Sequence, residues 1–446
     1  MPELRTITEA AEFIRTGELT PTALLEQCLS RIDRYEDRVR AWVYIDREGA
    51  REQASRLTTE LKAGQNRGPL HGIPVGIKDI IDVFDMPTAC GSKRWANSYA
   101  RRDATCVERL RSAGAVIMGK TVTTVFASFD PPPTRNPWNL DRTPGGSSSG
   151  SAAAVACGMC LGALASQTGG SITRPASYCG VYSLKPTHGR VSVDGVLPLA
   201  PSLDHVGVMA NSVRDLAILL QPLAALDNDN GSNPYHYLSE MNQSGSMRFR
   251  QLSALPDFPA TASPEMTAAF AALRDKTRAA EWAWNELPLP PSFADAPRFQ
   301  HTIMAVEAAT YHGARMARHP DDYPPKVRSL IEHGLATPAP HFVNVIKHHK
   351  AMRDEIERAF VDTWRIFATP ATAGPAPSAE TTGDPVFNSP WSYTGLPTVS
   401  LPFAWSADGM PLAVQLIGER YCEDDLLAVA NMLEADIAFE RRPLPL

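Results

Sequence analysis

Apolar residues recur every three or four positions along much of residues 7–62, which is the spacing of an amphipathic helix. Thr20 and Pro21 mark one helix start within this region. A threonine hydroxyl can cap a first helical turn, and proline suits the first helical position because its φ is already helical. The pattern therefore predicts a helical N-terminal region over residues 7–62.

From Gly68 onward, short β-branched runs bounded by glycine and proline replace this spacing. Runs of this kind are typical of buried strands, and they occupy residues 74–83, 115–121 and 206–210. Helical patterns lie between them, at residues 104–114 and 151–166. Strands that alternate with helices indicate an α/β layered fold.

Residues 226–297 interrupt this alternation with a polar, turn-rich stretch and then a stretch rich in alanine and proline. We interpret them as a variable segment at the periphery. Regular patterns then return: helices at 299–318, 341–366 and 424–437, and strands at 397–405 and 412–418.

Strand patterns near both ends of the chain predict one α/β domain over residues 1–446, with a large central mixed β-sheet covered by helices on both faces. Its parts would be the helical region, a core over residues 68–225, the variable segment, and residues 298–446. The last part would complete the sheet.

The charge balance, with 43 Lys and Arg against 49 Asp and Glu, gives a net charge of −6. No block of lysine and arginine stands out, which argues against a nucleic-acid partner. The seven cysteines are an odd number, so a complete disulfide framework cannot use all of them and a reducing compartment is favoured. Residues 152–165 are too short to span a bilayer, and the N-terminus lacks an apolar signal segment. We expect a cytoplasmic protein without a membrane partner.

Two motifs match known patterns without their structural context. Residues 114–121 read GAVIMGKT, the spelling of a phosphate loop, but the interior residues are strand-like and a helical pattern precedes them. Residues 146–150 read GSSSG, the spelling of a nucleophile elbow, but a loop pattern precedes them where that motif needs a strand. We therefore expect neither nucleotide binding nor an elbow.

Cysteine and histidine pairs give no further site. Cys157 and Cys160 have redox spacing, but we interpret them as small packing residues of an alanine-rich helix. His348 and His349 lie in a helical pattern flanked by lysine, which indicates a solvated face. No clustered cysteine and histidine pattern suggests a metal.

Two glycine–serine segments, residues 143–158 and 166–180, carry the candidate chemistry. Paired glycines before serine indicate close backbone approach. Successive N–H groups of Thr168, Gly169, Gly170 and Ser171 could form an anion-binding nest, as an oxyanion hole requires. A serine in such a nest is placed for acyl transfer if a base removes its proton, although the same residues are also common in ordinary loops.

Lys78 is the available base, since it stands in a strand pattern with apolar neighbours on both sides. Burial disfavours the charged form of lysine, lowers its pKa and so allows it to accept a proton. The alternative is an exposed lysine at a strand end.

Together, five segments resemble the amidase signature family of serine hydrolases and stand in the family's order. They are GPLHGIPVGIKDIIDV, RTPGGSSSGSAAAVACG, QTGGSITRPASYCGVYSLKPTHGRVS, SLDHVGVMANSVRDLA, and TGLPTVSLP followed by GMPLAVQLIG. The resemblance extends from about residue 7 to residue 434 and is weakest over 226–297. It implies the amidase signature fold and hydrolysis of an amide C–N bond without a metal or cofactor.

The family uses a Ser–cis-Ser–Lys triad, and each member has a matching position here. By this resemblance Lys78 is the base, Ser147 follows a cis peptide bond, and Ser171 is the nucleophile. Ser171 would attack the substrate carbonyl while Ser147 passes the proton between Ser171 and neutral Lys78. Water would then release the acyl group. Ser148 and Ser149 would support this relay or would be ordinary loop serines.

Several positions depart from the family pattern. Gln167 stands where many members have aspartate, and Val122 and Val125 stand where many have asparagine and glutamate. Arg174 lies three residues after the nucleophile, where members of malonamidase type carry an arginine that meets a carboxylate. We expect Arg174 either to bind a substrate carboxylate or to hold the loop through backbone carbonyls.

Three alternatives to a simple amidase remain open from the sequence. A carbamate or aryl-amide hydrolase would use the same triad, and a component of a glutamine amidotransferase shares the family but works in a complex. A binding protein on the same scaffold would normally have lost the triad. The expected partner is a small-molecule amide or carbamate, and the sequence leaves a homodimer open.

Overall fold

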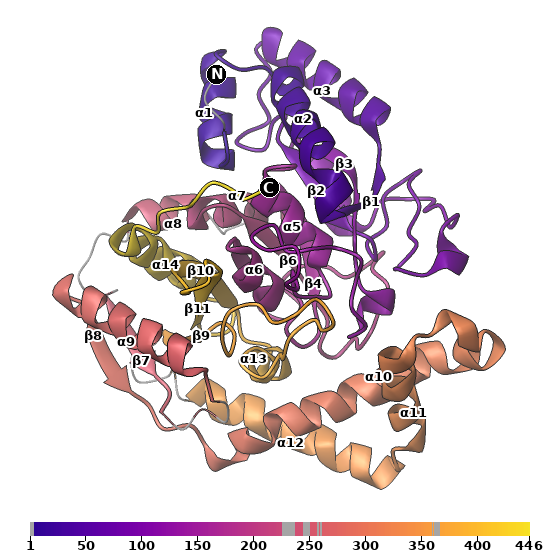
Figure 1. Ribbon diagram of the computed structural model, residues 1–446, viewed down its shortest axis with the longest axis vertical. Helices are drawn as coiled ribbons and strands as arrows, with labels where there is room; N and C mark the ends of the chain where they lie inside the picture. The colour runs from indigo at the N-terminus through magenta and orange to yellow at the C-terminus, as the bar shows by residue number, and fades with distance from the viewer. Residues whose placement is uncertain are drawn as a thin grey trace, which may run out of the picture.

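The computed structural model describes residues 4–224, 237–243, 250–256, 258, 261–358, 360 and 366–446. Within them, eleven strands form one mixed sheet in the order β1-β3-β2-β4-β6-β5-β10-β11-β9-β7-β8 (Figure 1). The strands are β1 (Trp42–Ile45), β2 (Pro74–Lys78), β3 (Val116–Thr121), β4 (Gly162–Gln167), β5 (Tyr182–Lys185), β6 (His205–Ala210), β7 (Gln251–Ala254), β8 (Ala283–Glu286), β9 (Phe367–Pro370), β10 (Thr398–Trp405) and β11 (Pro411–Ile417).

The helices surround this sheet. In the first half they are α1 (Ile7–Thr16), α2 (Pro21–Val39), α3 (Arg47–Lys62), α4 (Thr105–Ser112), α5 (Ser149–Cys157), α6 (Thr173–Cys179) and α7 (Val213–Leu223). In the second half they are α8 (Tyr237–Gln243), α9 (Pro264–Ala279), α10 (Ala296–Arg318), α11 (Pro325–Ala336), α12 (Ala339–Arg358), α13 (Ser389–Thr394) and α14 (Glu423–Ile437). None of the described helices is long and apolar enough to cross a membrane.

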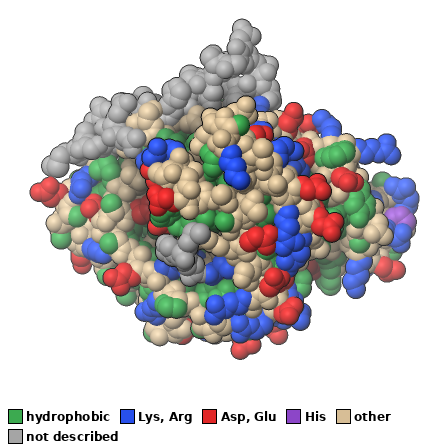
Figure 2. Space-filling view, turned by 90° about the horizontal axis from the view of Figure 1, so that it is seen from above, with side chains coloured by type: hydrophobic (Ala, Val, Ile, Leu, Met, Phe, Trp, Pro, Cys, Tyr) green, Lys and Arg blue, Asp and Glu red, His purple; other side chains and the backbone are tan. Residues whose placement is uncertain are grey.

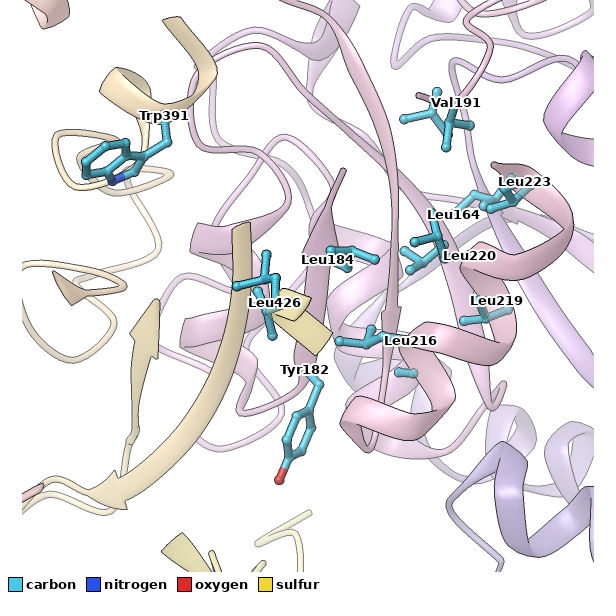
Figure 3. Close-up of a cluster of buried hydrophobic side chains, with 14 of the residues drawn as sticks. Leu164, Tyr182, Leu184, Val191, Leu216, Leu219, Leu220, Leu223, Trp391 and Leu426 are labelled. Atoms are coloured by element: carbon cyan, nitrogen blue, oxygen red, sulfur yellow. The ribbon is translucent and has the colours of Figure 1, made fainter. Parts of the chain in front are cut away.

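The two faces of the sheet bury separate apolar clusters. Side chains alternate between the faces along a strand, so Leu164 of β4 joins one cluster while Ala163 and Ala165 join the other. Leu164 packs beside the leucines of α7 (Figure 3), and α14 packs against α7. Helices α5 and α6 contact each other and cover the opposite face. The single mixed sheet with helices on both faces confirms the predicted fold class.

The N-terminal prediction holds for three helices, α1, α2 and α3. Thr20 caps α2 by accepting a hydrogen bond from the Ala23 N–H, and Pro21 is the first helical residue. Strand β1, at Trp42–Ile45, lies between two of these helices and was not predicted. It pairs antiparallel with β3 at the edge of the sheet, where four residues are too few for a recognisable alternation.

The predicted helix over residues 151–166 is wrong in its second half. Helix α5 ends at Cys157 because Gly158 follows it with φ +66°, a left-handed conformation that stops a helix. Residues 162–167 form strand β4 instead, which pairs with β2 and β6 in the middle of the sheet. Its alanine-rich texture resembles a helix, but the two neighbouring strands decide its conformation.

Strands β7 and β8, from residues 226–297, lie at the opposite edge of the sheet from β1. Much of the polar stretch in that part of the chain lies outside the described residues, and the predicted division of the domain into parts stays a prediction. On the face shown in Figure 2, lysine and arginine side chains are interspersed with aspartate and glutamate.

Candidate active site

Lys78 ends β2, and its side chain is completely buried. Its Nζ lies 2.7 Å from Ser147 Oγ and 2.8 Å from Ser166 Oγ. Because β2 and β4 run parallel, the end of β4 brings Ser166 beside Lys78. The structure therefore brings together the predicted Lys78 and Ser147, and it adds Ser166 as a second hydroxyl on the amine.

Burial lowers the pKa of the Lys78 ammonium to about 7, because the charged form loses its hydration. The carboxylate of Asp204 opposes this effect, since a nearby negative charge favours the ammonium. The amine can therefore lose its proton near neutral pH. A neutral buried amine beside a serine hydroxyl can accept a proton.

Residues 145–149 hold Ser147 against Lys78. Gly145 has φ +81°, and a Cβ there would lie 2.7 Å from Pro175 Cα, so both its conformation and its surroundings require glycine. The peptide bond between Gly146 and Ser147 is cis. Ser149 Oγ donates a hydrogen bond to the Gly145 carbonyl at 2.7 Å.

Ser148 connects this segment to the end of β4. Its Oγ donates a hydrogen bond to the Ser166 carbonyl at 3.2 Å and accepts one from the Ser166 N–H at 3.3 Å. The two hydroxyls of Ser148 and Ser149 therefore fix the backbone on either side of the Lys78 contacts. Their geometry favours the supporting role over that of ordinary loop serines.

Residues 168–171 connect β4 to α6, and side chains from distant segments hold their carbonyl groups. Gln300 of α10 donates to the Thr168 carbonyl at 3.0 Å, and Ser392 of α13 donates to the Gly169 carbonyl at 2.8 Å. Among the described residues, no protein acceptor is paired with the N–H groups of Gly169, Gly170 and Ser171. The loop can therefore offer these N–H groups to a bound oxyanion.

Gln167 stands where many members of the amidase signature family have aspartate. Its Oε1 accepts hydrogen bonds from the N–H groups of Ile172 at 2.8 Å and Thr173 at 3.0 Å. Its Nε2 donates to Ser392 Oγ at 3.0 Å, the same hydroxyl that holds the Gly169 carbonyl. The neutral amide of Gln167 therefore caps the start of α6. Through Ser392 it also helps to hold the loop at residues 168–171 in place.

Ser171 lies between this loop and α6 with 8% of its surface exposed, so it is the most accessible of the three predicted triad residues. In the described part of the chain, the hydrogen bonds of Lys78 and Ser147 do not include Ser171 Oγ. Catalytic hydrogen bonds often form only when a substrate is bound. The link between Ser147 and Ser171 therefore stays a prediction.

Arg174 has surroundings unlike those that binding of a substrate carboxylate requires. It is 1% exposed, and its Nη1 and Nη2 donate to the carbonyls of Gly383 and Gly146 at 2.9 and 2.7 Å. Burial lowers the pKa of its guanidinium to about 10. Two of its nitrogens are committed to backbone carbonyls. The geometry thus favours the alternative role, in which Arg174 holds the loop, and binding of a substrate by Arg174 stays a prediction.

Residues 114–121, which match the phosphate-loop pattern, have a structural role in packing. Its second half is strand β3, and Lys120 is completely buried, with its Nζ 3.1 Å from Asp79 Oδ1 and 2.9 Å from the Pro87 carbonyl. A lysine committed in this way is not available to phosphate. Cys157 and Cys160 are buried free thiols, which agrees with their interpretation as packing residues.

The prediction of a solvated histidine face is wrong. His349 is 8% exposed, and its Nε2 contacts the Tyr393 carbonyl at 2.6 Å. His348 contacts the Tyr393 hydroxyl at 2.9 Å through its Nδ1. Helix α13 covers this part of α12, and His349 lies on the same buried face of α12 as Val345, Met352 and Ile356, at helical spacing.

Sequence reasoning missed Ser166, Gln300 and Ser392 as contributors to the site. Ser166 could have been found from its position five residues before Ser171, had residues 162–167 been assigned to a strand parallel to β2. Gln300 and Ser392 lie more than a hundred residues from the loop, and no local pattern connects them to it. Within the described residues, no three His, Cys, Asp or Glu side chains converge as a metal site requires.

Comparisons with known proteins agree with this geometry. The family model described as Amidase matches residues 23–427, so the chain belongs to the amidase family. The A component of a glutamyl-tRNA(Gln) amidotransferase from Roseiflexus sp. (strain RS-1) is 35% identical, over 96% of this chain and 95% of the relative. A putative amidase, AmiD, from Mycobacterium bovis is 32% identical, over 98% of this chain and 95% of the relative.

A solved structure described as a crystal structure of an amidase superposes with a TM-score of 0.85. It is 34% identical, and the superposition covers 96% of this chain and 99% of that one. The protein is therefore an enzyme of the amidase signature type, a hydrolase that acts on amides.

The pKa of Lys78 predicts the pH dependence of the reaction. If Lys78 must be neutral in the free enzyme, kcat/KM should rise as the pH increases through about 7, where the ammonium loses its proton. The measurement is a pH–rate profile of the wild type and of Lys78→Ala. The variant should lose most of the activity and this rising limb. An optimum near pH ~5 would instead indicate a carboxylate or histidine base.

Ser166→Ala should lower kcat by about tenfold to a hundredfold with little change in KM, because the amine of Lys78 loses one of its two hydroxyl contacts and its orientation. Ser177→Ala is the matched control. Ser177 is also a buried serine, but it contacts Thr372 instead of Lys78. Similar kinetic losses in both variants would mean that Ser166 contributes only to packing.

Arg174→Ala should reduce kcat/KM by the same factor for a dicarboxylic monoamide and for the methyl ester of that monoamide. The reason is that the guanidinium contacts the Gly146 and Gly383 carbonyls, so its removal disturbs the loop for every substrate. Parallel kinetics on the two substrates provide the measurement. A loss confined to the acidic substrate would restore the carboxylate-binding assignment.

Proposed function

We propose that the protein hydrolyses the C–N bond of an amide through an acyl-enzyme on Ser171, with Ser147 and Lys78 as the proton relay. The observation that carries the proposal is the buried Lys78 amine, whose pKa lies at about 7 and which contacts Ser147 Oγ at 2.7 Å. A buried lysine without a counter-charge in direct contact is costly, and proton transfer gives it a use.

In the first step, Ser171 Oγ attacks the substrate carbonyl carbon and gives its proton to Ser147, which passes its own proton to neutral Lys78. The carbonyl oxygen becomes an oxyanion, and the N–H groups of residues 168–171 stabilise it. The relay then returns the proton to the departing amine as the C–N bond breaks.

The second step releases the acyl group. Water attacks the ester that Ser171 forms with the acyl group and gives its proton to the same relay, and a carboxylic acid leaves while Ser171 regains its proton. Every step uses only groups of this chain, the substrate and water. The contacts of Gln300 and Ser392 with the loop support the proposal, because a preorganised oxyanion hole needs its donors to stay in place.

The class of amide that the enzyme accepts can be determined by measuring hydrolysis of small amides, monoamides of dicarboxylic acids, anilides and carbamates. A carbamate or aryl-amide hydrolase remains the alternative interpretation of this site, because each of these substrates would form an acyl-enzyme by the same chemistry. We further propose a small molecule as the substrate. A homodimer and a cytoplasmic location stay predictions.

A second candidate is a component of a glutamine-dependent amidotransferase. The glutamyl-tRNA(Gln) amidotransferase relative favours it, at 35% identity over nearly the whole of both chains. Release of ammonia from glutamine, together with co-purification of partner proteins, would support this candidate. Efficient turnover of other amides by the isolated chain would favour the simple amidase.

Ser171→Ala should reduce hydrolysis of the best panel substrate by about 10⁴-fold or more, since it removes the group that forms the acyl-enzyme. A serine-directed sulfonyl fluoride should label the wild type at Ser171, as peptide mass spectrometry can show. Ser55→Ala, which changes an exposed serine of α3, serves as the control and should keep full activity and labelling. A folded Ser171→Ala chain that retains much of the wild-type rate would refute the assignment.

A further inference from the structure

Asp204 lies at the start of β6, in the segment SLDHVGVMANSVRDLA that helps to carry the family resemblance, and the relay described above does not use it. Strand β6 pairs antiparallel with β4, and their register sets Gln167 opposite His205. One step further along both strands, Thr168 comes opposite Asp204. Asp204 therefore lies where β4 passes into the loop that carries Ser171.

Three donors hold the carboxylate of Asp204. Thr168 Oγ1 donates to its Oδ1 at 2.5 Å, and the N–H groups of Leu199 and Ala200 donate to its Oδ2 at 2.9 and 3.0 Å. Gln300 donates to the carbonyl of the same threonine at 3.0 Å. Thr168, the first residue of the loop, is thus fixed at both its hydroxyl and its carbonyl.

The same strand end brings the carboxylate near the amine of Lys78. Ser166, whose Oγ lies 2.8 Å from Lys78 Nζ, precedes Thr168 by two residues, the spacing of side chains on one face of a strand. Ser166, Thr168 and Asp204 line one small cavity of about 10 Å³. A space of that size holds about one water molecule, so solvent screens little of the attraction between carboxylate and ammonium.

The other titratable groups around Lys78 leave Asp204 as its main source of negative charge. Burial raises the pKa of the Cys90 thiol well above its ordinary value, so that group stays neutral. The carboxylate of Asp79, the next residue in the chain, is paired with Lys120 at 3.1 Å. Against the effect of burial, the Asp204 carboxylate raises the pKa of the Lys78 ammonium.

Asp204 itself has charged and titratable neighbours. Burial raises the pKa of its carboxyl, the three donors lower it, and the carboxylate of Glu307 on α10 raises it. Glu307 accepts hydrogen bonds from the Ser202 N–H at 2.9 Å and the Ser202 hydroxyl at 2.5 Å. Burial lowers the pKa of the adjacent His205 well below its ordinary value, so the imidazole is neutral.

We propose that Asp204 is a positioning residue of the relay, which fixes the start of the Ser171 loop through Thr168 and places a negative charge near Lys78. This role rests on the proposed function, in which Lys78 takes up a proton from Ser147 and later returns it. The carboxylate stabilises the ammonium that forms in between, and it neither contacts the substrate nor accepts the proton.

Asp204→Asn keeps the shape of the side chain and removes its charge. The rising limb of kcat/KM should move to lower pH by about 0.5–1 unit, because the ammonium of Lys78 loses a favourable charge and its pKa falls. The plateau above the limb should fall by about tenfold, since Lys78 becomes a weaker base and Thr168 loses its ionic acceptor. The measurement is a pH–rate profile. If Asp204→Asn does not fold, Asp204→Ser, which is also neutral and can accept a hydrogen bond, replaces it.

Two further variants separate the charge from the contact with the loop. Thr168→Val removes the hydroxyl but keeps the carboxylate, so it should lower the plateau and leave the limb in place. Asp215→Asn is the matched control, because the Asp215 carboxylate also accepts from two N–H groups and a threonine hydroxyl, those of Ile7 and Thr8. It holds the start of α1 and is not among the charges that act on Lys78, so limb and plateau should stay unchanged.

A readout without turnover distinguishes this proposal from the proposed function. Carbon NMR of the chain labelled at the lysine Cε atoms, with the Lys78 signal assigned by Lys78→Ala, gives the pKa of the amine directly. That pKa should be lower in Asp204→Asn than in the wild type, by the same amount as the limb moves. If instead Lys78 is not the base, the limb persists in Lys78→Ala while the NMR shift in Asp204→Asn remains.

Three results would overturn the role of Asp204. The first is a Lys78 pKa that Asp204→Asn leaves unchanged. The second is an equal shift in Asp215→Asn, which would show a general response of the fold. The third is a folded, active Asp204→Asn chain without any rising limb, which would mean that Asp204 itself titrates in the reaction.

Discussion

The burial of one amine organises the candidate site. Lys78 ends a strand in the interior of the sheet, where its charged form is unfavourable, and two serine hydroxyls lie within hydrogen-bond distance of its Nζ. The next residue, Asp79, has a different partner, because its carboxylate contacts Lys120 of β3. Among the described residues, the amine of Lys78 therefore contacts only neutral groups, whereas Lys120 is paired with a carboxylate.

The sheet supplies the other half of this arrangement. Parallel pairing of β2 with β4 brings the end of β4 beside Lys78, and residues 168–171 follow directly from that strand. The loop then depends on helices α10 and α13, whose side chains hold its carbonyl groups. The ends of two central strands thus position the reacting groups, and long-range contacts from α10 and α13 hold the loop beside them.

Arg174 shows that spacing along the chain does not decide which groups an arginine contacts. Its spacing from Ser171 suggests that it faces the substrate, yet α6 directs the guanidinium toward the carbonyls of Gly146 and Gly383. The same residue therefore joins the segment of Ser147 to residues near the C-terminal part of the chain. Which partner an arginine finds depends on the surfaces that meet around it, and spacing alone does not contain that information.

Much of the fold could be predicted because local patterns and final structure agree there. Thr20 and Pro21 start α2 as their chemistry requires, and the β-branched runs become β2, β3 and β6. The failures occur where neighbours override a local preference. The alanine-rich β4 is a strand because β2 and β6 pair with it, and His349 of α12 is buried where α13 packs against that helix.

By itself, the sequence determined the class of protein, the order of most elements and the residues that are candidates for the relay. It could do so because glycine–serine segments, an apolar-flanked lysine and periodic patterns are local properties of the chain. The tertiary structure alone decided that Lys78 contacts Ser166 as well as Ser147, that Arg174 holds backbone, and that Asp204 contacts Thr168. Those contacts join residues far apart in the chain, and their energies depend on burial and distance, which exist only after the sheet has formed.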